Sequence, residues 1–174
     1  MRGFVLLMGV ALLLGPAGAA VAQQQVPTAA APFSRANIIR VQTAALPDSV
    51  LAQLKRHLTA RGYTIDSLDA VRGLLTTKVT VPATRPADQL KLRAVRVAAG
   101  WKITGLFTLE GPTRGSATAF PAQFLGLENA PAKTAFREVE ALARAVPRGT
   151  LSYDQAKVSF GPFTKLEEAL KSVW

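Results

Sequence analysis

The sequence predicts an α+β fold, in which an antiparallel sheet of about four to five strands carries helices on one face and a short helix ends the chain. Two observations lead to this class. The spacing of apolar residues switches between a period of two and a helical period, in the order β-α-β-β-β-β-α. Two predicted hairpins also follow each other and precede a helix, which favours an antiparallel sheet covered by helices.

A strand and a helix open the predicted domain. Residues 37–43 alternate, with Ile39 and Val41 on one side and Arg40 on the other, as expected of a strand. A helix is expected to begin at Pro47 and to end at Gly62, which suits the left-handed position after a helix. Its apolar stripe consists of Val50, Leu51, Leu54 and Leu58.

Two hairpins are expected next. The first pairs residues 64–68 with 74–81, and the second pairs residues 89–97 with 101–109. In the third of these strands the alternation of apolar residues changes phase near Ala94. A β-bulge at that point would restore a continuous apolar face.

The remaining elements are a connection, a second helix and a tail. Residues 111–130 predict a long connection, residues 132–146 an amphipathic helix ended by Pro147, and residues 151–160 a short strand. A capping-box pattern at residues 164–167 predicts the last helix. The side chains expected to face a common sheet from the two long helices are Leu54, Leu58, Phe136 and Val139.

The N-terminal segment is typical of a cleaved signal peptide. Arg2 precedes an apolar run at residues 4–14, and Ala20-Val21-Ala22 supplies the small residues before a cleavage site. The run is shorter than the roughly 20 residues that cross a bilayer. We therefore expect a soluble, periplasmic or extracellular product without a transmembrane anchor. The expected divisions are residues 1–22 as signal peptide, 23–35 as flexible leader, 36–146 as the α+β domain and 147–174 as a C-terminal tail packed on it.

Composition narrows the chemistry that the chain supports. It contains no cysteine, which excludes disulfides and thiolate metal sites, and His57 is its one histidine. We expect His57 to be a surface or partly covered side chain on the first helix. Asp66 and Asp69 are interpreted as solvated turn residues. On a strand they are expected on opposite faces, poorly placed to share a metal ion or to act as acid and base. The sequence predicts no catalytic residues, no metal site and no cofactor.

Positive charge is the main functional signal. The net charge of +10 suits contact with anionic headgroups or polymers, and since no nucleic-acid-binding motif accompanies it, nucleic acid is not the expected partner. A charged face that only keeps the sheet soluble is the simpler interpretation of the same residues. The candidate anion-binding residues, which form a positive platform if they share the exposed face of the sheet, are Lys78, Lys91, Arg93 and Lys102.

Three short motifs carry a resemblance to a known group of proteins. They are Gly62-Tyr63-Thr64-Ile65-Asp66, Gly73-Leu74-Leu75-Thr76-Thr77 and Lys102-Ile103-Thr104-Gly105. With them, residues 36–109 resemble small exported Bacteroidetes domains of unknown function. Such domains are similar in architecture to those of a lipoprotein of the outer-membrane barrel-assembly machine. The resemblance implies a helix-on-sheet α+β fold and brings no catalytic residues with it.

These observations favour an exported, noncatalytic module that binds a protein partner or an anionic envelope component such as a polymer. Two alternatives stay open. One is a hydrolase-type enzyme with a site near residues 111–130, and the other is an electrostatic binder of nucleic acid or lipopolysaccharide. An outer sheet face that is open and basic would favour binding, whereas one covered by the tail would favour a structural role. The sequence does not predict an oligomeric state.

Overall fold

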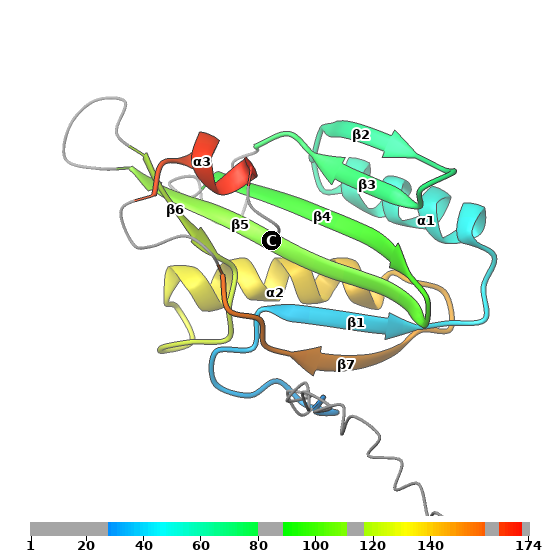
Figure 1. The fold of residues 1–174 in the computed structure, drawn as a ribbon, viewed down its shortest axis with the longest axis horizontal. Helices are drawn as coiled ribbons and strands as arrows, with labels where there is room; N and C mark the ends of the chain where they lie inside the picture. The colour runs from blue at the N-terminus through cyan, green and yellow to red at the C-terminus, as the bar shows by residue number, and fades with distance from the viewer. Residues whose placement is uncertain (1–27, 80–88, 111–116, 159–163, 172–174) are drawn as a thin grey trace, which may run out of the picture.

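The computed structural model describes residues 28–79, 89–110, 117–158 and 164–171. Within these ranges the chain forms one seven-stranded antiparallel sheet with three helices (Figure 1). The α+β class, the antiparallel sheet and the short C-terminal helix are therefore confirmed. The expected signal peptide at residues 1–22 lies outside the described residues.

The elements follow the predicted order up to residue 110. They are β1 (Ile38–Gln42), α1 (Pro47–Ala60), β2 (Ile65–Asp69), β3 (Leu74–Thr77), β4 (Gln89–Val97), β5 (Gly100–Glu110), β6 (Ala117–Pro121), α2 (Pro131–Arg144), β7 (Thr150–Asp154) and α3 (Leu166–Lys171). The predicted total of four to five strands was too low. β6 lies inside the segment predicted as a connection, and β7 joins the sheet beside β1.

The long strand β5 organises the sheet, whose order is β2-β3-β4-β5-β1-β7 with β6 also paired to β5. β4 occupies one edge of β5 from Gly100 to Thr108. The other edge is shared: β1 pairs near the start of β5, where Ile39 lies opposite Ile103, and β6 pairs near its end. β6 is a strand because β5 is long enough to offer it an unpaired edge, a feature that short-range alternation does not reveal.

The main core lies between α1, α2 and one face of the sheet. Leu54 and Leu58 of α1 and Phe136 and Val139 of α2 are at most 1% exposed and belong to one hydrophobic cluster, as predicted. α1 and α2 lie behind the sheet in Figure 1, and α3 lies in front of it. The opposite surface of the sheet, called the outer face below, carries a small second cluster under α3: Leu106, Ala119 and Ala169.

Helix α2 approaches β5 closely at Gly105. A Cβ atom on Gly105 would lie 2.7 Å from Val139 Cγ2 and 3.1 Å from Ala122 Cβ. The Gly105 carbonyl also accepts a hydrogen bond from the backbone N–H of Ala122, at 2.8 Å. The absence of a side chain at Gly105 thus sets the spacing between helix and sheet.

The backbone conformation and the strand register test two local predictions. Gly62 has φ +83° and ends α1, as predicted. The bulge predicted near Ala94 was wrong, because β4 pairs with β5 in unbroken register and Val95 lies half-buried on the outer face. A register shift occurs instead in β2, between Ile65 and Ser67.

The two ends of the described domain pack together. Ala29, in the segment expected to be a leader, exchanges backbone hydrogen bonds of 2.9 and 2.8 Å with Tyr153 of β7. The N–H of Arg35 donates to the carbonyl of Phe124 at 2.9 Å. Backbone pairing therefore begins before Ala36, and the segment after α2 contributes a sheet strand.

Candidate anion-binding face

Three cations lie on adjacent strands of the outer face. Lys102 of β5 is directly opposite Arg40 of β1, and Thr104 is opposite Arg93 of β4. Because residues two apart on a strand share a face, Arg93, Lys102 and Arg40 form one row across the sheet. We call these three side chains the basic row.

The other two predicted residues belong to a separate group around Asp66. Lys91 Nζ lies 2.8 Å from Asp66 Oδ2, and the Lys91 side chain is only 15% exposed. The hydrogen bond from Lys91, together with the charges of Lys91 and Lys78, lowers the pKa of Asp66. The predicted platform is therefore divided, and Asp66 offsets part of the charge of Lys78 and Lys91.

The β2 bulge explains this pairing. Asp66 is the extra residue between the paired positions Ile65 and Ser67, and its carboxylate reaches the outer-face residue Lys91. Asp69 is in register with Leu74, which also faces outward. The expectation that the two aspartates lie on opposite faces was wrong, since a bulge reverses the alternation of side chains.

Lys102 lies between the two arginines of the basic row. Burial lowers the pKa of Lys102, and the charges of Arg93 and Arg40 lower it further, whereas Asp154 opposes them. Asp154 is already bonded to Arg40, with Oδ2 2.8 Å from Nη2 and 3.0 Å from Nε. No carboxylate in the described part of the chain lies within 4.0 Å of Lys102 Nζ. Among the described carboxylates, Asp154 alone acts on the charge of Lys102, and it does so while bonded to Arg40.

The outer face is covered at one end and exposed at the other. α3 lies over the end of the sheet formed by β5 and β6 (Figure 1). Arg93 and Lys102 are half-buried, and the Arg40 side chain is 44% exposed. The sequence left two alternatives, an open outer face and one covered by the C-terminal tail. The outer face is covered by the tail at one end and accessible at the other, where the basic row lies.

A small cleft adjoins the basic row where the chain leaves β7. Lys102, Thr104 and Lys157 line it together with Asn37, and the rest of its wall consists of apolar residues and glycine: Ile38, Gly105, Pro121, Ala156 and Val158. Sequence reasoning missed Arg40, Thr104 and Lys157 as members of this face. Alternation placed Arg40 on the polar side of its strand, but only the pairing of β1 with β5 makes it a neighbour of Lys102.

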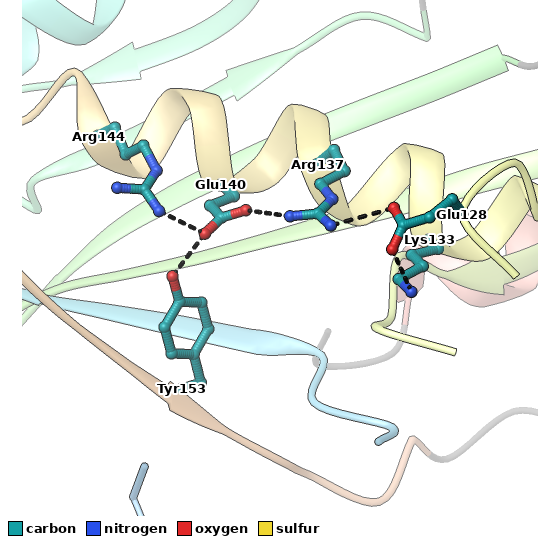
Figure 2. Close-up of polar contacts among 6 residues, drawn as sticks. All are labelled: Glu128, Lys133, Arg137, Glu140, Arg144 and Tyr153. Atoms are coloured by element: carbon teal, nitrogen blue, oxygen red, sulfur yellow. Dashed lines mark hydrogen bonds and ion pairs between the residues drawn. The ribbon is translucent and has the colours of Figure 1, made fainter. Parts of the chain in front are cut away.

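On the helix side of the sheet, a polar network surrounds Glu140 (Figure 2). Its carboxylate accepts hydrogen bonds from Tyr153 at 2.6 Å and from Arg144 at 2.8 Å, and Arg137 lies 3.4 Å away. Arg137 also binds Glu128, which pairs with Lys133. Each charge has a partner, so the network ties α2 to β7 and to the loop before α2.

His57 lies in a second polar cluster between α1 and α2. It is half-buried, and its Nε2 atom has no hydrogen-bond partner among the described residues. Burial lowers the pKa of His57, as does the charge of Arg61, and Glu138 opposes them. Glu138 itself binds Arg61 at 2.6 Å and accepts a hydrogen bond from Tyr63 at 3.2 Å. Burial and Glu138 both raise the pKa of Tyr63.

A cavity of about 330 Å³ lies where the β4–β5 turn meets the segment before α1, with Gln42, Arg96 and Trp101 in its wall.

No group of three or more potential metal ligands from His, Cys, Asp and Glu occurs among the residues described. The helices in the described ranges are too short or too polar to cross a membrane.

No protein-family model matches the chain, and no curated protein is significantly similar to it.

Proposed function

We propose that this protein is an exported, noncatalytic module that binds an anionic component of the cell envelope through the basic row. Support for export comes from the signal-peptide pattern at residues 1–22. The similarity of residues 36–109 to exported domains of unknown function is part of the same proposal.

The observation that carries the proposal is the environment of Lys102. Three like charges share adjacent strands, and Asp154 is the one carboxylate that acts on Lys102 among its described neighbours. Like charges held close together at a partly desolvated surface repel each other, and that repulsion is relieved when an anion binds. A face that only provides solubility has no need to concentrate charge in this way, because dispersed charges serve as well.

The test is equilibrium binding of the protein to long-chain inorganic polyphosphate and to phosphatidylglycerol vesicles, with phosphatidylcholine vesicles as the neutral comparison. The double variant Arg93→Gln/Lys102→Gln removes two charges from the basic row. Lys55→Gln/Arg56→Gln removes the same charge from exposed positions of α1 and is the matched control.

We expect the protein to bind an anionic probe with an affinity that falls as salt is added, because protein cations that contact the probe release its counterions. The row variant should lower the slope of log K against log salt by about 2, one for each lost contact, whereas the control should change it less. Equal losses in the two variants would show that only net charge matters. Absence of binding to both anionic probes at low salt would contradict the proposal.

A further inference from the structure

The cleft beside Lys102 has a wall that is held in place by specific hydrogen bonds. Asn37 Nδ2 donates to the Ala156 carbonyl at 2.8 Å, and Asn37 Oδ1 accepts from the Ala156 N–H at 2.9 Å. The Gln155 N–H donates to Asp154 Oδ1 at 2.7 Å. These bonds hold the chain after β7 against the outer face and set Lys157 beside the cleft.

Two of the polar residues that line the cleft carry hydrogen-bond donors with no acceptor among the described residues. Neither the Lys102 ammonium group nor the Thr104 hydroxyl has a hydrogen bond to any described residue, although Thr104 is only 5% exposed. Lys157 adds an exposed positive charge at the rim. A hydroxyl and an ammonium group on residues that line one cleft are well suited to an anion, which accepts from both.

The size of the cleft limits what enters it. Its volume is about 30 Å³. A water molecule needs at least about 10–15 Å³ on the same measure, so the cleft has room for about two groups of the size of a water molecule. This room suits the two oxygen atoms of a carboxylate, or two oxygen atoms of a phosphate group whose other atoms stay outside the cleft, and it is too small for a sugar ring or a nucleobase.

We propose that this cleft is a subsite for a single oxyanion, a phosphate or carboxylate group of the anionic ligand, bound by Lys102, Thr104 and Lys157. The inference rests on the proposed function, because it assigns one group of that ligand to one place on the outer face. Such a subsite differs from general electrostatic attraction because full affinity also requires an uncharged side chain, that of Thr104.

The experiment is an NMR titration of the protein with inorganic phosphate and, separately, with acetate. A site predicts saturable shifts of the backbone amides of Thr104, Ala156 and Lys157. It also predicts that the pKa of the Lys102 ammonium group rises when the anion binds, since a negative charge opposes Arg93 and Arg40. The anion that binds more tightly identifies the chemical group.

Thr104→Val tests the site without changing charge. The loss of one hydrogen bond should weaken binding of the tighter anion by about threefold to tenfold. Thr76→Val, on the same face but outside the cleft, is the matched control and should keep the affinity of the original protein. Lys102→Met retains the apolar stem of the side chain and should abolish saturable binding. Amide spectra of each variant without ligand verify that it is folded.

Equal affinities of Thr104→Val and Thr76→Val would overturn the subsite. If polyphosphate binds through the basic row but neither phosphate nor acetate saturates, the subsite is wrong and the proposed function stands. If neither the polymer nor vesicles bind, the proposed function is wrong and the subsite falls with it.

Discussion

Tyr153 on β7 donates its hydroxyl hydrogen to Glu140 on α2, with the two oxygen atoms 2.6 Å apart. Glu140 is 5% exposed, a position where a carboxylate needs compensating partners. Burial alone raises the pKa of Glu140, but the hydrogen bonds from Tyr153 and Arg144 and the charges of Arg144 and Arg137 outweigh it and lower the pKa. The bond therefore helps to keep a buried charge stable between helix layer and sheet.

Replacing Tyr153 with Phe should lower the free energy of unfolding by about 1–3 kcal/mol, because Glu140 loses a donor that water replaces poorly. Chemical denaturation measures this change. Tyr63→Phe is the comparison: its bond to Glu138 is longer, at 3.2 Å, and Glu138 keeps Arg61 at 2.6 Å, so the loss should be smaller. A loss at Tyr63 that equals or exceeds the loss at Tyr153 would contradict this account.

The raised pKa of Tyr153 leads us to expect that the protein loses stability at high pH. Burial, the hydrogen bond to Glu140 and the charge of Glu140 raise the pKa of Tyr153 from 10.0 to about 12. A raised pKa means that folding favours the neutral phenol, so this contribution is complete below pH 10 and is lost as pH rises through about 12. The stability difference between the original protein and Tyr153→Phe should shrink over this range. A constant difference in denaturation experiments would refute the assignment.

Gly105→Ala should destabilise the protein by about 1–3 kcal/mol, because the new methyl group meets Val139 Cγ2 at 2.7 Å. Val139→Ala removes that atom. The double variant should therefore be less destabilised than the sum of the two single variants, a difference that a double-mutant cycle of unfolding free energies measures. Strict additivity would mean that the α2–β5 contact does not limit residue size at position 105.

His57→Gln should leave anion binding unchanged and alter only the acid stability. The pKa of His57 is lowered from 6.5, chiefly by burial, so the fold favours the neutral ring. That contribution is present above pH 6.5 and is lost as pH falls through the folded-state pKa. The variant should show a smaller loss of stability on acidification from pH 6.5. Loss of binding in a folded variant would instead implicate His57 in binding and contradict the assignment of binding to the basic row.

Most elements were predictable because their signals are local. The apolar stripe at Leu54 and Leu58 repeats at the helical period whatever surrounds it, and Gly62 marks the end of α1 through its own backbone preference. β6 was missed for the opposite reason. Residues 117–121 alternate weakly, and they form a strand because the end of β5 has an unpaired edge beside them.

The failed bulge prediction has a similar cause. The apolar Val95 was assumed to need the core, but on the outer face it lies between Leu74 and Lys102, whose side chains leave it half-buried. A residue can lose contact with water on either face of a sheet, and alternation alone does not distinguish the two.

For the candidate site, the charge, the absence of cysteine and the shared face of Lys91 and Arg93 were predictable, since these depend on composition and on a period of two. The folded sheet sets which cations are neighbours. It paired Lys91 with Asp66 through a bulge and set Arg40 beside Lys102 by inserting β1 next to β5. Alternation is a property of one strand, whereas register depends on hydrogen bonds between strands distant in the chain.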